Sequence, residues 1–269
     1  LESVAFSIDG LEENDDHLRR HPGHFRKALD AAIACGRHGL KASVVTTVTQ
    51  RNLPELEKMR EVLAEHGVLR WQLQLGTPTG NMAEHPELVI RPEDMLHIVP
   101  LIAAMCRDDK KPKVYPGHDI GYFGDTEEAL RAQSDPIPYW LGCSAGCSVI
   151  GIESNGNIKG CLSLPSSKEK VDDFVEGNVR GSSLREVWFR KGAFAYNREF
   201  TLDNLDGFCR SCEYAEICRG GCTWINFATA GSKRDNPYCY WRQLKLKEAR
   251  ERGEPIPESP NPVRLPILP

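Results

Sequence analysis

The chain has 269 residues, enough for one large domain or two ordinary ones with a sizeable hydrophobic core. Its formal net charge is −4 and its pI is near 6.1, and basic residues are scattered among acidic ones, which argues against a nucleic-acid-binding surface. No apolar run approaches the length of a membrane span, so we expect no membrane partner.

Strands and helices are predicted to alternate from the first residues onward. Val4 to Ile8 is a short apolar run typical of a strand, and the acidic stretch Glu12 to Asp16 is predicted to be a solvated loop. His24 to Cys35 has apolar residues three and four apart, which indicates an amphipathic helix. Lys41 to Val48 is β-branched and apolar, as expected for a buried strand of a parallel sheet.

The same alternation continues over the next seventy residues or so. Leu53 to His66 is predicted to be a helix with Asn52 as its N-cap, and Leu69 to Leu75 a strand. A further helix runs from Arg91 to about Arg107, and Lys113 to Tyr115 is a short strand. Helical connections between strands imply a parallel sheet, whose ligands bind at the C-terminal strand ends.

Short elements replace long helices from Cys143 onward. Asn155-Gly156 predicts a hairpin turn, and Phe174 to Val179 a short strand. Leu184 to Phe189 is predicted to be a helix, with Ser182 as N-cap and a capping box between Ser183 and Glu186. Helical character is also predicted for the segment from Thr223 onward and for Tyr240 to Arg252. The last segment, Glu254 to Pro269, is predicted to be a proline-rich extended tail.

Eight of the ten cysteines lie in the C-terminal half of the chain. They are Cys143, Cys147, Cys161, Cys209, Cys212, Cys218, Cys222 and Cys239. Two sets of four thiolates would complete two [4Fe–4S] clusters, or two structural zinc sites as the alternative. Disulfides are a third interpretation, which the paired Cys-x2-Cys spacing disfavours. Cys35 and Cys106 lie on apolar helix stripes and are predicted to be inert core thiols.

The cysteine pattern resembles the SPASM domain of radical S-adenosylmethionine (radical SAM) enzymes. The matching residues are Cys147-x8-Gly156-x4-Cys161, then Cys209-x2-Cys212-x5-Cys218-x3-Cys222, then Cys239, with Cys143 as an extra upstream cysteine. The resemblance implies that one auxiliary [4Fe–4S] cluster is held by Cys143, Cys147, Cys161 and Cys222. It implies that the second is held by Cys209, Cys212, Cys218 and Cys239.

The N-terminal half resembles the second half of the partial (β/α) barrel of the same enzymes. The expected fold is α/β, with the half barrel over residues 1–110, a linker over 111–140, a small α+β SPASM domain over 141–252 and a tail over 253–269. Ser7-Ile8-Asp9-Gly10 matches a Ser-Leu-Asp-Gly strand end. The resemblance implies that Ser7 and Arg19 contact the methionyl and ribose portion of S-adenosylmethionine, and that Gln74 and Leu75 border its adenine.

Two departures from the family pattern limit what the resemblance implies. Radical SAM enzymes need a Cys-x3-Cys-x2-Cys loop, and this sequence contains no such triplet. Because the sequence begins at Leu1 in a strand-like run, we expect roughly 90 residues to precede it, at about 30 per βα unit, and the chain to be inactive alone. Leu162 stands where sulfatase-maturing relatives have an aspartate, which favours another peptide or peptide-derived substrate.

The function implied is that of a cytoplasmic radical SAM/SPASM enzyme that modifies a peptide or protein by hydrogen abstraction with a 5′-deoxyadenosyl radical. Its cofactors would be the two auxiliary clusters, S-adenosylmethionine and a third [4Fe–4S] cluster, with flavodoxin or ferredoxin as electron donor. A non-catalytic zinc or iron–sulfur interaction module is the alternative. No catalytic residue is identified; Tyr115, Asp119, Tyr122 and Asp125 include candidate proton acceptors, with ordinary loop polarity as the other interpretation.

Overall fold

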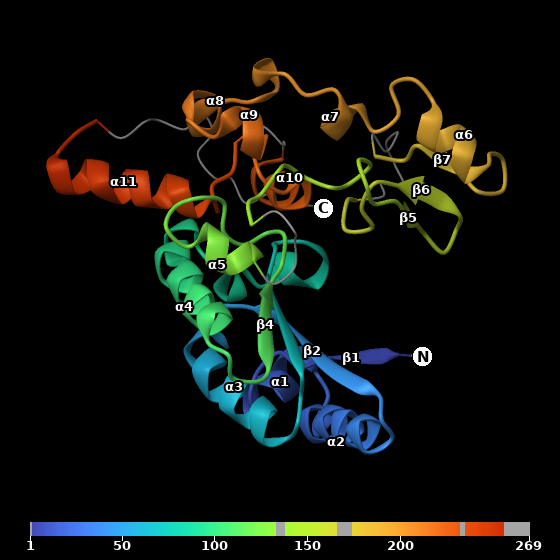
Figure 1. The fold of residues 1–269 in the computed structure, drawn as a ribbon, viewed down its shortest axis with the longest axis vertical. Helices are drawn as coiled ribbons and strands as arrows, with labels where there is room; N and C mark the ends of the chain where they lie inside the picture. Colours follow the sequence, from blue (N-terminus) through green and yellow to red (C-terminus); the bar gives the residue numbers. More distant parts are fainter. Residues whose placement is uncertain (1, 133–137, 166–173, 232–234, 256–269) are drawn as a thin grey trace. The chain divides into compact units, whose positions relative to one another are not determined.

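The structure is a computed structural model that describes residues 2–132, 138–165, 174–231 and 235–255 (Figure 1). It divides into two compact units. The first contains the chain up to Tyr139 together with Tyr238–Arg252, and the second contains Trp140–Pro237. Each unit has its own sheet, and each is described here by itself.

The first unit is built on a four-stranded parallel sheet with the order β1-β2-β3-β4. Its strands are β1 (Ser3–Ser7), β2 (Lys41–Val48), β3 (Arg70–Leu75) and β4 (Lys113–Pro116). Its helices are α1 (Glu12–Arg19), α2 (His24–Arg37), α3 (Leu56–Glu65), α4 (Met95–Arg107), α5 (Glu127–Arg131) and α11 (Tyr240–Arg252). All four strands run the same way, so their C-terminal ends meet at one edge, as the sequence predicts.

Helices cover this sheet and bury its apolar side chains. α2 packs against β1 and β2, and α4 packs against β4 (Figure 1). Val44, Trp71, Leu73 and Val114 from the strands are fully buried. The parallel α/β architecture predicted from the strand and helix periodicity is therefore confirmed.

The acidic stretch Glu12 to Asp16 was predicted to be a solvated loop, and this is wrong because it forms α1. Its acidic residues lie in the first turn, where the helix dipole favours negative charge. Asp15 is fully buried; its carboxylate accepts a hydrogen bond from the Asp9 amide at 2.7 Å and pairs with His24 Nδ1 at 2.6 Å. Tertiary partners that the sequence does not display thus stabilise this helix.

Asn52 was predicted to be a helix N-cap, and it does occupy the position before the first helical turn, but its side chain does not cap that turn. The chain enters α3 through a 3₁₀ turn, Leu53–Glu55, and the Asn52 side chain makes no capping bond. Its amide group instead donates to the carbonyl oxygens of Asp9 and Thr47 at 2.6 and 2.8 Å, and its oxygen accepts from the Thr49 amide at 2.7 Å. Asn52 is fully buried and ties the ends of β1 and β2 together.

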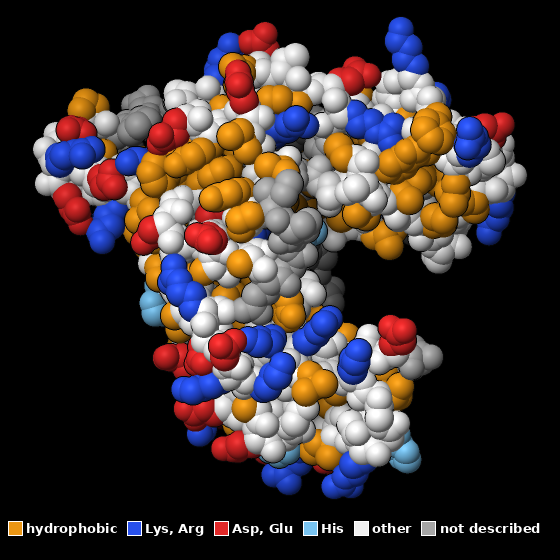
Figure 2. Space-filling view, viewed as in Figure 1, with side chains coloured by type: hydrophobic (Ala, Val, Ile, Leu, Met, Phe, Trp, Pro, Cys, Tyr) orange, Lys and Arg blue, Asp and Glu red, His pale blue; other side chains and the backbone are white. Residues whose placement is uncertain are grey.

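The second unit has a three-stranded antiparallel sheet with the order β5-β6-β7. Its strands are β5 (Gly151–Ile152), β6 (Asn157–Lys159) and β7 (Gly177–Asn178), and its helices are α6 (Leu184–Phe189), α7 (Ala195–Arg198), α8 (Gly207–Ser211), α9 (Ala215–Cys218) and α10 (Thr223–Ala230). Hydrophobic side chains gather on the surface over β5–β7 and α6 (Figure 2). Exposed members include Ile152, Val179, Leu184 and Phe189.

The predicted turns of this unit are largely confirmed. β5 and β6 form a hairpin around Asn155 and Gly156, and Gly156 has φ +91°, a backbone conformation that favours glycine. The capping box of α6 is present, but the N-cap is Ser183 and not Ser182, because the Ser183 hydroxyl accepts from the Glu186 amide. Most of the predicted proline-rich tail lies outside the described residues.

None of the helices within the described ranges is both long enough and apolar enough to cross a membrane.

Candidate cluster and cofactor sites

The structure brings Cys143 and Cys222 together, although they lie far apart in the sequence. Their side chains are hydrogen-bonded; Cys143 also contacts the Thr223 side chain and receives hydrogen bonds from the amides of Thr223 and Ala145. These contacts, with that of Cys222 the largest, hold the pKa of the Cys143 thiol below its usual range in spite of burial. A thiolate surrounded by donors is what a metal ion or an iron–sulfur cluster takes as a ligand.

Cys147 and Cys161 lie on the adjoining segments. Cys147 is exposed at the turn after Cys143, and its pKa is raised by partial burial and next by the charge of Cys143. Cys161 follows β6 and is half-buried. The Tyr196 phenol feels the charges of both Cys143 and Cys161, which add to the rise that burial causes in its pKa. The structure therefore brings Cys143 and Cys222 into contact and places Cys147 within reach of the charge of Cys143.

The second predicted set is divided between the two units. Cys209 on α8 and Cys212 at its C-terminal end pack into one small apolar core with Ala215, and Cys218 ends α9. Backbone amides point at two of these sulfurs: that of Asn236 donates to Cys209 Sγ at 3.3 Å, and that of Tyr214 to Cys212 Sγ at 3.4 Å.

Cys239 belongs to the first unit, just before α11. It is buried there, and its thiol contacts the carbonyl oxygen of Tyr122 at 3.7 Å.

Within the described parts of the chain, no three or more His, Cys, Asp or Glu side chains form a group that could hold a metal ion. The chemistry of the donor set nevertheless fits an iron–sulfur cluster, because cysteine sulfurs are the ligands of such clusters and amide donors face two of these sulfurs. Amide donation to sulfur is one of the means by which proteins set a cluster's reduction potential. The assignment of four particular cysteines to each cluster stays a prediction.

Cys35 and Cys106 lie away from these sets, on helices of the first unit. Burial raises the pKa of the Cys106 thiol to about 11, so it is a poor metal ligand. Its Sγ contacts the carbonyl oxygen of Val114 at 3.4 Å. Cys35 on α2 is half-buried.

A second site lies at the C-terminal edge of the parallel sheet, centred on Asp9. The Asp9 carboxylate pairs with the Arg19 guanidinium at 2.5 Å and accepts from the Thr47 amide at 2.7 Å. Burial raises the pKa of Asp9, and the Thr47 hydrogen bond and the charge of Arg19 oppose that rise. Asp9 thus joins the end of β1 to the end of β2 and to the last residue of α1.

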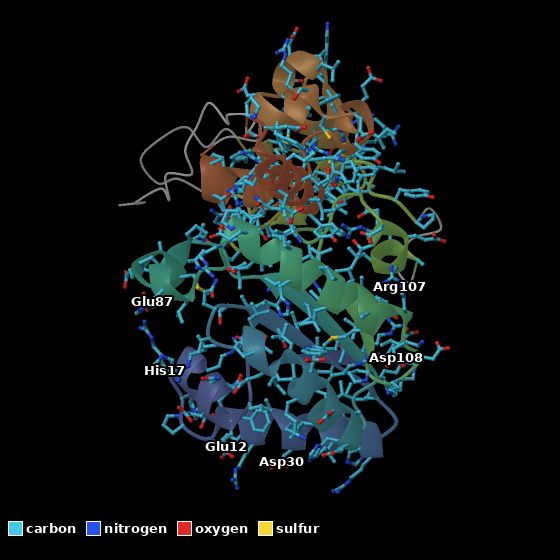
Figure 3. The ribbon with its side chains drawn as sticks, turned by 90° about the vertical axis from the view of Figure 1, so that its left-hand side faces the viewer. Glu12, His17, Asp30, Glu87, Arg107 and Asp108 are labelled. Carbon is cyan, nitrogen blue, oxygen red and sulfur yellow. The ribbon has the colours of Figure 1, made fainter. Side chains whose placement is uncertain are left out.

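A cavity of about 710 Å³ opens beside this ion pair. Three stretches line it: the end of β1 with α1, the end of β2, and the segment after β3. Its polar lining residues include Asp9, Arg19, Thr47 and His85. His17, another lining residue, lies on the same side of the unit as Glu87 (Figure 3), and Glu87 pairs with His85.

Of the four predicted S-adenosylmethionine contacts, only Arg19 lines this cavity. Ser7 is exposed at the end of β1. Gln74 is half-buried and its amide lies 3.4 Å from Thr47 Oγ1, while Leu75 is buried and donates its amide hydrogen to Asp119 at 2.7 Å. All four lie at the same sheet edge, but the structure does not gather them around one pocket.

Sequence reasoning missed several residues of these sites. Asp15, which binds the Asp9 amide, was predicted to lie in a solvated loop, and no site role was predicted for His24, which pairs with Asp15. Thr223 and Tyr196, which contact the cysteine-bearing segments, carry no motif. Asp119 was one of four candidate proton acceptors, and burial raises its pKa to about 6.

Residues 143–213 match the SPASM family, described as an iron-sulfur cluster-binding domain. The chain carries a SPASM domain. The resemblance to radical SAM enzymes with such a domain is confirmed by its relatives. One is the AdoMet-dependent heme synthase of Methanosarcina barkeri, 26% identical over 257 residues that cover 91% of this chain and 69% of the relative.

Another relative is the mycofactocin maturase MftC of Mycobacterium tuberculosis, 27% identical over 95% of this chain and 62% of its own length. Among solved structures, SuiB of Streptococcus suis bound to its precursor peptide SuiA superposes with a TM-score of 0.60, at 15% identity. The alignment covers 87% of this chain and 51% of SuiB. The shared architecture confirms the predicted α/β fold followed by a SPASM domain. The chain spans about half to two thirds of the length of these proteins.

Proposed function

We propose that the chain is part of a cytoplasmic radical SAM/SPASM enzyme that modifies a peptide or protein. The observation that carries this proposal is the pairing of Cys143 with Cys222, in a unit whose residues 143–213 match a family of iron–sulfur cluster-binding domains. A peptide substrate is supported by the maturase among the relatives and by the structural neighbour that is bound to a precursor peptide.

In this proposal the SPASM domain holds two auxiliary [4Fe–4S] clusters. Cys143, Cys147, Cys161 and Cys222 hold the first, and Cys209, Cys212, Cys218 and Cys239 hold the second. The clusters accept an electron from substrate or shape the site where it binds. Backbone amides such as that of Asn236, which donates to Cys209 Sγ, would orient the ligands.

The sheet edge of the first unit takes S-adenosylmethionine in the same proposal. When bound, S-adenosylmethionine and its own cluster supply a 5′-deoxyadenosyl radical that removes a hydrogen atom from the substrate. Arg19, fixed by Asp9, would face the anionic or hydroxylated part of the molecule, with Ser7, Gln74 and Leu75 along the same edge. Asp9 keeps the guanidinium in place before the ligand arrives, which lowers the entropy cost of binding.

The cluster that cleaves S-adenosylmethionine needs a Cys-x3-Cys-x2-Cys loop, which this sequence does not contain. We therefore assign the radical step to the full-length protein and expect the chain by itself to be inactive. An electron donor such as flavodoxin or ferredoxin would supply the reducing electron.

The test is an anaerobic reaction of the full-length protein with S-adenosylmethionine, a reductant and a small peptide encoded beside its gene. The expected result is a change in the peptide's mass that appears together with 5′-deoxyadenosine. A protein that forms no 5′-deoxyadenosine with any substrate contradicts the enzyme proposal and favours a non-catalytic metal-binding module.

A second candidate substrate class is a precursor of heme, favoured by the similarity to AdoMet-dependent heme synthase. The same assay distinguishes the two classes. If 5′-deoxyadenosine forms with a heme precursor that is converted to heme, while peptides stay unchanged, the substrate is the heme precursor.

A further inference from the structure

Three separate segments of the second unit carry the four cysteines predicted for the first cluster. They are the turn that follows Cys143, the end of the β5–β6 hairpin at Cys161, and the start of α10 at Cys222. A cluster binds only if all three segments are held at fixed mutual positions, because its four thiolate ligands must converge. Contacts made by residues other than the cysteines can help to hold these positions.

The short helix α7, which carries no cysteine, contacts all three segments. Asn197 makes two of these contacts. Its Nδ2 donates to the Ala145 carbonyl oxygen at 2.8 Å, and its Oδ1 accepts from the Thr223 hydroxyl at 2.8 Å. Ala145 lies between Cys143 and Cys147, and Thr223 follows Cys222, so one side chain links two of the three segments.

The residues on either side of Asn197, Tyr196 and Arg198, make the remaining contacts with the cysteine-bearing segments. The Tyr196 phenolic oxygen packs directly against Gly160, which precedes Cys161: a Cβ atom at Gly160 would come within 2.3 Å of that oxygen. Arg198 Nε donates to the carbonyl oxygen of Gly146, next to Cys147, at 2.6 Å. Consecutive side chains of α7 thus contact a residue within two positions of each of the four predicted ligands.

α7 is itself held rigidly. Its N-cap, Phe194, is fully buried and adopts a left-handed backbone conformation with φ +57°, which is costly for a residue other than glycine. The Phe194 amide donates to Glu176 Oε1 at 2.7 Å. The Arg198 guanidinium lies 4.3 Å from the centre of the Trp188 ring and 4.7 Å from that of Phe194. Such cation–π contacts fix the direction of the Arg198 side chain as well as its position.

The turn between Cys143 and Cys147 packs closely against Phe194, the N-cap of α7. Gly146 has φ +76°, and a Cβ atom there would come within 2.5 Å of the Phe194 Cγ atom. Only glycine therefore fits between Cys143 and Cys147 at this point. A strained, buried residue that packs directly on the ligand loop is the kind of feature that the surrounding structure maintains at functional sites.

We infer that Tyr196, Asn197 and Arg198 are positioning residues for the first auxiliary cluster. They act on the backbone beside the cysteines and not on the cluster itself. This inference rests on the proposed function, because it presupposes that the first set of cysteines binds a cluster.

The test compares the full-length protein with an Asn197→Ala variant after anaerobic loading with iron and sulfide. This substitution removes both hydrogen bonds and leaves the Ala145 carbonyl and the Thr223 hydroxyl without that partner. We expect the auxiliary-cluster iron to fall by about half, since one of two clusters is lost. The matched control is Asn204→Ala, which removes an asparagine of the same unit whose oxygen accepts from the Thr201 amide.

A second variant separates positioning from folding. Tyr196→Phe keeps the ring, whose centroid lies 5.3 Å from that of Phe174, and removes only the phenolic oxygen that packs against Gly160. We expect the cluster to load but its midpoint potential and electron paramagnetic resonance spectrum to change. A purely structural tyrosine would leave both unchanged.

The outcomes are distinct. Loss of one cluster in Asn197→Ala, with both retained in Asn204→Ala, supports the inference. If Asn197→Ala and Tyr196→Phe both keep two clusters with unaltered potentials and spectra, the inference is wrong while the proposed function stands. If the wild-type protein binds no iron, the inference and the proposed function both fail.

Discussion

At the scale of single residues, buried carboxylates organise the C-terminal edge of the sheet. The Asp9 carboxylate binds Arg19 and the Thr47 amide, and the Asp15 carboxylate accepts a hydrogen bond from the Asp9 amide. Asp119 does the same for the next strand, where it accepts from the amide of Leu75 at 2.7 Å. Each carboxylate satisfies a backbone group at a strand end that would otherwise be buried without a partner.

Asp119 should titrate well above an ordinary aspartate. Burial raises its pKa to about 6, against the opposing effect of the Leu75 hydrogen bond. Because the fold favours the protonated form, the contribution of Asp119 to stability is present at low pH and is lost as the pH rises from its ordinary value of 3.8 through about 6. The amide chemical shift of Leu75 should follow this ionisation, with a midpoint near that pH.

The control for this titration is Asp119→Asn, which should abolish the shift change at Leu75. Asp109 offers a comparison in the wild-type protein, because pairing with Lys113 lowers its pKa and it should not titrate in the same range. A midpoint near 3.8 at Leu75 would show that burial does not govern Asp119.

At the scale of secondary-structure elements, the sequence predicts what depends on local pattern. β2 was predicted with its observed bounds because its run of β-branched residues favours a strand. α1 was missed because its first residues, Glu-Glu-Asn-Asp-Asp-His, have no apolar stripe; Asp15 is buried by Asp9 and His24, which come from other elements. α7 was also missed, because its side chains bind carbonyl groups that are distant in the sequence.

The connection between β1 and β2 gives a prediction at this scale. Asn52→Ala removes three hydrogen bonds from a fully buried side chain and leaves their backbone partners unsatisfied. We expect the free energy of unfolding of the first unit to fall by roughly 3 kcal/mol. Urea denaturation followed by circular dichroism measures it.

The matched control is Lys58→Ala, a nearby substitution on α3 that removes an exposed ion pair with Glu61. It should leave the urea midpoint unchanged, because exposed pairs contribute little. An Asn52→Ala variant as stable as the Lys58→Ala variant would show that Asn52 is not the connection between the two strands.

At the scale of the whole molecule, the account depends on cysteines contributed by distant segments. Cys143 and Cys222 meet in the second unit, while Cys239 belongs to the first. The spacing of the cysteines predicts that a cluster-binding domain is present, but which four sulfurs share a cluster depends on how the segments fold. Metal binding and folding of the second unit should therefore be coupled, as in other small metal-binding domains.

The most direct test is the metal content of the anaerobically purified chain after loading with iron and sulfide. The account predicts about eight iron and eight sulfide ions per chain, with a Mössbauer spectrum of [4Fe–4S] clusters, and about half that content in a Cys222→Ser variant. A colourless protein that binds zinc and no iron would contradict it.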